Sequence, residues 1–207
     1  MAYLTLNPWQ SLWWRPRQTF RRLLDEAPGY NVMTLAALSG VATALGQASG
    51  HGLGSQMSLW LLLPVCLLLG PLLGWAELWI GSWLLARIGH WLGGDADSAE
   101  LRTVMAWSGL PNVFGLLVWL MMTLQQGQAL FLPRTPEQMT QLSAQPGFAI
   151  LAGLQLILGF WSLWLLWLGV AEAQHLSWPK ALLNLLLTAM AVLILLSPLR
   201  LLFEHLR

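Results

Sequence analysis

Charge is what this sequence has least of. Asp, Glu, Lys and Arg make up 9% of its 207 residues, whereas a soluble domain carries about 25%. Hydrophobic residues make up 57%, and the mean hydropathy is +0.60. A water-soluble fold of this length could not cover so much apolar surface with a polar exterior. The scarcity of charge therefore excludes a soluble globular domain and indicates an integral membrane protein.

Other features are also missing. The single cysteine, Cys66, cannot form an internal disulfide. No G-x-S-x-G, H-E-x-x-H, P-loop or G-x-G-x-x-G motif occurs. No secretory signal peptide is expected, because the first apolar segment begins near Val32, behind an arginine-rich stretch and without a small-residue cleavage site. With a net charge of +1, these absences predict a non-enzymatic protein with no cofactor and no nucleic-acid partner.

Long uncharged runs are what the sequence does have. They cover residues 27–76, 103–133, 138–171 and 181–199. A membrane-spanning helix needs about 20 mostly apolar residues, and the absence of period-2 alternation favours helices over a barrel. We therefore predict an all-α polytopic bundle with five transmembrane helices, the second and third being long and forming a hairpin. The expected spans are residues 32–48, 57–91, 103–125, 148–171 and 179–203.

The second span leaves the number of passes open. At about 1.5 Å per residue, residues 57–91 would reach roughly 50 Å, beyond a hydrocarbon core of about 30 Å. Either one helix continues out of the membrane, or Gly70-Pro71 breaks it into two passes. Both alternatives place the N-terminus inside by the positive-inside rule. With five passes, the inner side carries Arg15, Arg17, Arg21, Arg22, Arg87, Arg102 and Lys180, and the outer side carries Arg134, Arg200 and Arg207.

Residues 7–26 predict an amphipathic N-terminal helix. Asn7 is a favourable N-cap and Pro8 a favourable first residue. Because Pro16 interrupts the pattern, two short helices are an alternative to one. The favoured interpretation is an interfacial helix lying on membrane lipid; the alternative is a helix packed on the bundle. The expected lipid-interface residues are Trp9, Trp13, Arg15, Arg17, Phe20, Arg21 and Arg22.

Two segments resemble the bacterial branch of the Yip1 family. They read RPRQTFRRLL at residues 15–24 and LGGDADSAELRTVMAWSGLP at residues 92–111. The resemblance implies five transmembrane helices, a cytosolic N-terminus and a role in membrane organisation or trafficking, which in eukaryotic members operates through small GTPases. The sequence has no clear copy of the eukaryotic DLYGP motif, so a GTPase link is not carried over. The chain is expected in the bacterial cytoplasmic (inner) membrane, as a cytosolic segment (1–30) and a five-helix region (31–207) forming one domain overall.

The hairpin between the second and third spans has a predicted tip at Gly93, Gly94, Asp95 and Asp97. The two glycines turn the chain. Asp97 then caps the next helix, with Glu100 three residues on. Counting back equally from this tip pairs Glu77 with the region of Pro111 and Asn112, Gly74 with Gly115, and Arg87 with Glu100–Arg102.

Glu77 is the only charged residue between Glu26 and Arg87. Because Pro111 has no N–H, the Trp107 carbonyl lacks its helical donor, and a protonated Glu77 could donate to it. An ion or proton role and contact with lipid headgroups are the alternatives. The intramembrane polar candidates are Glu77, Ser108, Asn112, Gln155 and Asn184.

Three functional hypotheses follow. The first is a non-enzymatic inner-membrane protein that organises membrane lipids, other membrane proteins or further copies of itself. The second is a permeation protein for a small solute, an ion or a lipid, which requires Glu77, Asn112, Gln155 and Asn184 to line one polar path. The third is a metal-dependent membrane enzyme, for which His90, Glu172 and His175 would have to converge within ligand distance.

Overall fold

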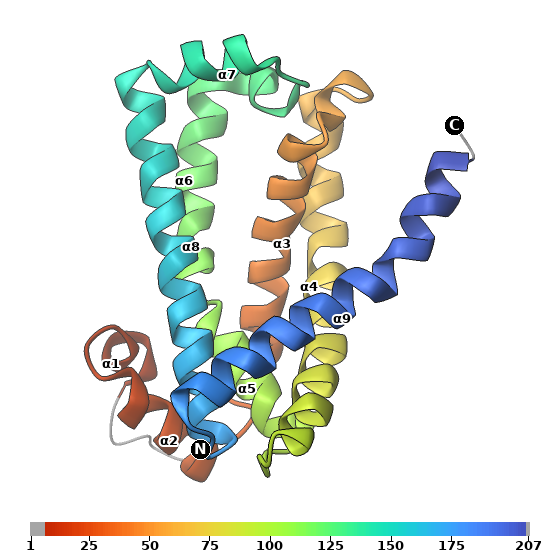
Figure 1. Ribbon diagram of the computed structural model, residues 1–207. Coiled ribbons are helices and arrows are strands. Elements are labelled where there is room, and N and C mark those ends of the chain that lie inside the picture. Colours follow the sequence, from red (N-terminus) through yellow and green to blue (C-terminus); the bar gives the residue numbers. More distant parts are fainter. Residues whose placement is uncertain (1–6, 206–207) are drawn as a thin grey trace. The chain divides into compact units, whose positions relative to one another are not determined.

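The computed structural model describes residues 7–205, with side chains for residues 7–195, so Arg207 and the Arg200 side chain lie outside the described part. All of the secondary structure described is helical (Figure 1). The elements are α1 (Pro8–Trp14), α2 (Pro16–Glu26), α3 (Val32–Gly50), η1 (Leu53–Ser55), α4 (Leu59–Trp91), α5 (Ser98–Ser108), α6 (Leu110–Gln126), η2 (Gly127–Phe131), α7 (Pro136–Ser143), α8 (Pro146–Ala173) and α9 (Trp178–His205).

Five segments of the described chain are long and apolar enough to span a membrane. They are Val32–Gly50, Leu59–Trp91, Ser98–Phe131, Pro146–Ala173 and Trp178–Leu195. The predicted all-α fold with five spans is thereby confirmed. The alternative of six passes is wrong, because α4 continues as one helix through Pro64 and Pro71. The third span is broken at Gly109, and Pro111 lies in the first turn of α6, where its missing N–H costs nothing.

The chain forms two compact units, each assembled from segments far apart in sequence. Unit 1 comprises Met1–Tyr30, Leu78–Met105 and Leu165–Arg207, and unit 2 comprises Asn31–Glu77 and Ala106–Trp164. Helices α4 and α8 each contribute residues to both units. A unit boundary does fall after Tyr30, but unit 1 also takes in later segments of the chain, and the expected division into a cytosolic segment and a five-helix region stays a prediction.

Within unit 2, small residues let α3 and α4 approach closely. A Cβ at Gly40 would overlap the backbone of Gly70 and Gly74, and a Cβ at Gly74 would overlap the carbonyl of Ala36. The expected approach of Gly74 to Gly115 is therefore wrong: Gly115 instead faces the Gln155 side chain on α8. Equal counting from the hairpin tip fails here because Gly74 packs against Ala36 and Gly40 of α3 instead.

The hairpin tip in unit 1 is closed by backbone and capping hydrogen bonds. Gly93 adopts a left-handed φ of 93°. Gly93 N donates to His90 O at 3.1 Å and Gly94 N to Gly89 O at 2.8 Å, which is the Schellman pattern. Asp97 Oδ1 accepts from the Ala99 and Glu100 amides at 2.7 and 2.8 Å, as expected from the sequence.

Arginine–tryptophan contacts accompany this hairpin. The Arg102 guanidinium lies 4.1 Å from the centroid of the Trp79 ring, across the two helices. The Arg87 guanidinium lies 5.7 Å from the Trp83 ring on its own helix, rather than beside Glu100. The Glu100 carboxylate accepts from Asp97 N at 2.8 Å instead, because it completes the capping box of α5.

Candidate functional site

The N-terminal segment of unit 1 forms two short helices rather than one. Asn7 Oδ1 accepts from Trp9 N at 3.1 Å and caps α1, which begins at Pro8. The chain breaks at Arg15, because Pro16 cannot supply the N–H that a continuous helix needs. Thr19 Oγ1 donates to Ser11 Oγ at 2.8 Å and ties α2 back to α1.

The apolar face of this segment is buried against the rest of unit 1. Leu12, Phe20 and Leu23 are 1%, 0% and 0% exposed. A Cβ at Gly169 of α8 would press on the Phe20 ring and on Val104, so the missing side chain makes room for the aromatic ring. The expectation that Phe20 contacts lipid is therefore wrong, since Phe20 packs on the bundle, as the alternative interpretation held.

A half-buried carboxylate fastens α2 to the end of α8. Arg21 Nε donates to Glu172 Oε1 at 2.9 Å, and Arg17 Nε lies 3.4 Å from Glu172 Oε2. The Glu172 side chain is 10% exposed, whereas those of Arg17 and Arg21 are 56% and 71% exposed. The Arg17 guanidinium also lies 5.4 Å from the ring of Trp178 on α9. Both arginines thus neutralise a sheltered negative charge while remaining accessible from outside.

This pairing explains why the expected metal candidates do not come together. No group of three His, Cys, Asp or Glu side chains that could hold a metal occurs among the residues described. Glu172 is engaged by the arginines instead. His175 lies in the turn after α8 with a left-handed φ of 50°, and His90 is exposed in the last turn of α4.

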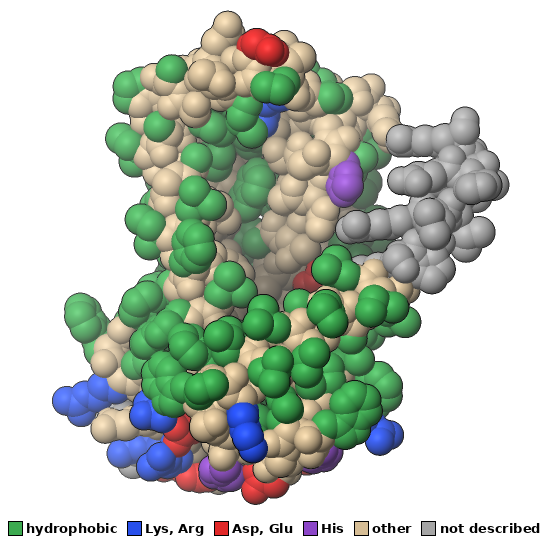
Figure 2. Space-filling model, in the orientation of Figure 1, with side chains coloured by type: hydrophobic (Ala, Val, Ile, Leu, Met, Phe, Trp, Pro, Cys, Tyr) green, Lys and Arg blue, Asp and Glu red, His purple; other side chains and the backbone are tan. Residues whose placement is uncertain are grey.

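The outward face of the segment is aromatic and basic. Trp14 is 86% exposed. An open hollow of about 620 Å³ lies beside it; its lining residues are Asn7, Trp9, Gln10, Ser11, Trp13, Trp14 and Arg15. Figure 2 shows Lys and Arg side chains of unit 1 gathered around α1 and α2. Tryptophan and arginine together are typical of a surface at the level of lipid headgroups.

Buried and partly buried polar residues of unit 2 pair with one another across the break in the third span. Asn112 Nδ2 donates to Ser162 Oγ at 3.2 Å, and Ser162 Oγ donates to Ser108 O. Ser162, which the sequence did not single out, accepts the hydrogen bond of the Asn112 amide.

Glu77 is exposed on α4 and forms no hydrogen bond or ion pair with any described residue. The expected pairing of Glu77 with the region of Pro111 is therefore wrong.

Buried amides of unit 1 converge on a single carbonyl. Asn184 Nδ2 and Gln174 Nε2 donate to Leu85 O at 3.2 and 3.1 Å. Both side chains are 0% exposed. Sequence reasoning missed Gln174, an amide in the turn that directly follows α8. Asn112 and Asn184 are thus each satisfied within their own unit, by Ser162 and by Leu85 O.

Five apolar spans, buried amides paired inside the bundle and a basic aromatic N-terminal segment define a polytopic helical membrane protein. Residues 9–198 match the Yip1 domain, and the chain belongs to the Yip1 family. No curated protein and no solved structure matches the chain.

Proposed function

We propose that this protein is a non-enzymatic organiser of the bacterial cytoplasmic membrane, acting through the face of α1 and α2. Membrane lipids with anionic headgroups are its proposed partners, with other membrane proteins and further copies of the chain as the alternatives. The observation that carries the proposal is the fastening of α2 to Glu172, which leaves Trp14 86% exposed and Arg21 71% exposed on a fixed support.

The described contacts support a cytoplasmic position for this face. Successive spans alternate sides, so five spans place the N-terminal segment, the turn after α4 and the turn after α8 on one side. Within unit 1, Lys180 Nζ donates to Leu92 O at 2.9 Å, and Arg21 pairs with Glu172. Seven of the ten Lys and Arg residues belong to this side, and the positive-inside rule favours the cytoplasm for it.

The other loops agree with this arrangement. Within unit 2, Gln128 Nε2 donates to Gly54 O at 2.8 Å, and Ser49 Oγ donates to Leu130 O at 2.7 Å. The end of α3 and the loop that follows it therefore contact the loop after α6, and two loops in contact must lie on the same side of the membrane. Arg134 is the single Lys or Arg among the described residues of these two loops.

The test uses the full chain, labelled with an environment-sensitive fluorophore through Trp14→Cys in a Cys66→Ser background. In nanodiscs containing phosphatidylglycerol we expect emission shifted to the blue relative to phosphatidylcholine, and a shift that weakens with salt because exposed charges are screened. Arg15→Glu should reduce the shift. Arg15 is chosen because a charge reversal at Arg17 or Arg21 would also break the ion pair with Glu172.

Arg87→Glu is the matched control, since Arg87 is exposed but belongs to the hairpin. If the emission of the label at position 14 stays at the wavelength typical of an aqueous environment in both lipids, whatever the charge at position 15, lipid contact is contradicted. A shift that appears only when a second membrane protein or a second copy is added would assign the face to that partner instead.

A further inference from the structure

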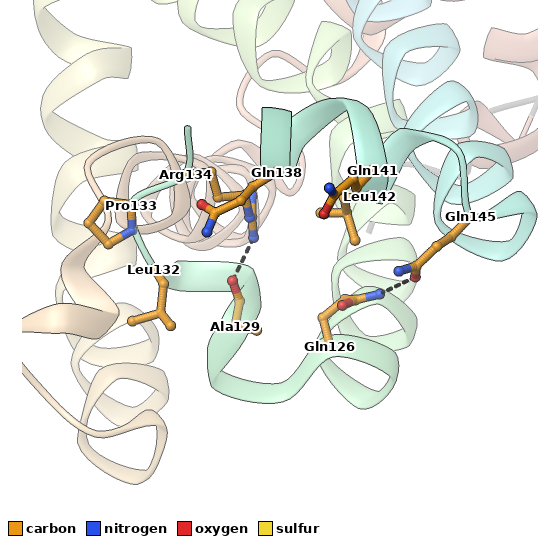
Figure 3. Close-up of a pocket in the computed structure, with 9 residues that line it drawn as sticks. All are labelled: Gln126, Ala129, Leu132, Pro133, Arg134, Gln138, Gln141, Leu142 and Gln145. Atoms are coloured by element: carbon orange, nitrogen blue, oxygen red, sulfur yellow. Dashed lines mark hydrogen bonds between the residues drawn. The ribbon is translucent and has the colours of Figure 1, made fainter. Parts of the chain in front are cut away.

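A polar pocket in unit 2 lies in the loop that joins α6 to α8 (Figure 3). Its volume is about 240 Å³, below the roughly 300–1,000 Å³ of pockets for drug-sized ligands. The side chains of Arg134, Gln138, Gln141 and Gln145 line it, with Leu132 and Leu142 supplying apolar wall. No lining residue is acidic. The pocket therefore has room for a small polar group and carries positive charge.

The charge of Arg134 is only partly satisfied by the protein. Arg134 Nη2 donates to Ala129 O at 2.8 Å, which is its one hydrogen bond to the described chain. Burial lowers the pKa of Arg134 from its ordinary value, but a guanidinium stays protonated at neutral pH. It offers five N–H donors in a planar fork, which matches the oxygens of a carboxylate or a phosphate. A partly exposed guanidinium with no acidic residue lining its pocket attracts an anion beside it.

Two of the neighbouring amides, those of Gln138 and Gln145, have their oxygens engaged inside the protein and present donors. Gln138 Oε1 accepts from Thr135 N at 3.0 Å, while Thr135 Oγ1 accepts from Gln138 N at 3.3 Å. This capping box fixes the orientation of the Gln138 amide, because its oxygen must face the N–H donor, and its NH₂ group remains available. Gln145 Oε1 likewise accepts from Gln126 Nε2 at 3.1 Å. The pocket therefore combines one guanidinium with amide NH₂ groups.

We propose that this pocket binds a phosphate group, held by Arg134 and the Gln138 amide. Two sources share this chemistry, namely the headgroup of an anionic phospholipid and free inorganic phosphate. The pocket follows the third span, which ends at Phe131, and precedes the fourth, which begins at Pro146, so it lies near the level of headgroup phosphates. Leu132, which lines the pocket and is 37% exposed, adds an apolar surface beside the polar groups. Both features favour the lipid headgroup.

The test measures phosphatidylglycerol retained by the purified full chain, using native mass spectrometry, and the shift in Tm caused by inorganic phosphate alone. Arg134→Gln should lower lipid retention roughly tenfold, as expected for loss of a charged hydrogen bond. Gln138→Glu should lower it as well. This second variant keeps the capping box, because Glu is accepted at that position, but turns the available NH₂ group into a carboxylate oxygen. Arg134→Lys should restore part of the binding, and Arg87→Gln is the matched control for lost charge.

The outcomes separate the two sources. Retention that falls in Arg134→Gln and Gln138→Glu but not in Arg87→Gln supports a headgroup site. A rise in Tm with inorganic phosphate that depends on Arg134, without preferential retention of phosphatidylglycerol, supports a soluble phosphate. If both variants equal the native chain with both probes while remaining folded by size-exclusion chromatography, the phosphate site does not exist.

Discussion

Glu172 shows how the surroundings of one residue decide its chemistry. In the sequence it forms an E-x-x-H pair with His175, which suggested a metal ligand. In the structure it lies one residue before the end of α8, where the helix dipole disfavours a carboxylate. Arg17 and Arg21 offset this cost, and Arg21 lies 151 residues away in sequence. No local pattern could reveal that partner.

We expect Glu172→Gln to loosen the docking of α2. Because both arginines are more than half exposed, the free energy that holds α2 in its docked position should fall by about 0.5–1 kcal/mol, as for a solvent-screened ion pair. Trypsin cleavage between residues 15 and 22 should then be about two- to fivefold faster in nanodiscs, since cleavage follows the population of the undocked segment. Glu26→Gln, an exposed carboxylate on the same helix, is the control. Equal cleavage rates in Glu172→Gln and the native chain would show that the Glu172 ion pairs do not hold α2 to α8.

At the scale of elements, α4 packs closely on α3, whereas the sequence suggested a polar pairing of α4 with the third span. Small residues four apart in a span, such as Gly40 and Ala44, are typical of close helix contacts, and Gly40 does lie against Gly70 and Gly74 of α4. Trp75 Nε1 adds a hydrogen bond to Met33 O at 3.0 Å between the same two helices. The sequence identified the residue able to make the contact, but the partner helix depended on how the spans pack.

This contact predicts a sharp difference between two glycines. Gly74→Ala should lower the stability of the detergent-solubilised chain by about 1–3 kcal/mol, the usual range for overpacking, because its Cβ would overlap the Ala36 carbonyl. Gly153→Ala on α8 should be neutral or stabilising, because no atom lies within 4 Å of its Cβ position. Thermal unfolding followed by size-exclusion chromatography checks both, and an unchanged Tm in Gly74→Ala would refute the tight α3–α4 contact.

For the whole molecule, the number of spans fixes which loops share a side. With five spans, the turn after α4 and the loop containing α7 lie on opposite sides of the membrane. In a Cys66→Ser background, Asp95→Cys should react with a membrane-impermeant thiol reagent only from the cytoplasmic side, and Ser143→Cys only from the other. Both native side chains are exposed. Gly94→Cys is unsuitable, because its Cβ would overlap the Gln174 amide.

Labelling of intact cells and of inverted vesicles distinguishes the two sides. Reaction of Asp95→Cys from outside the cell would reverse the proposed orientation. Reaction of both cysteines from the same side would contradict five alternating spans.

The sequence by itself determined that this is a membrane protein, its helical class and its local caps, because hydrophobic run length and capping chemistry act over a few residues. It determined the turn at Gly93 and the capping of α5 by Asp97 for the same reason. It left five or six spans open, and the continuous helix α4 decided for five. Only the tertiary structure decided that Phe20 packs against α8, that Glu172 holds two arginines and that Asn112 pairs with Ser162. Each of these contacts joins side chains from distant segments, and in lipid such pairs are selected by packing and by the need to satisfy buried polar atoms.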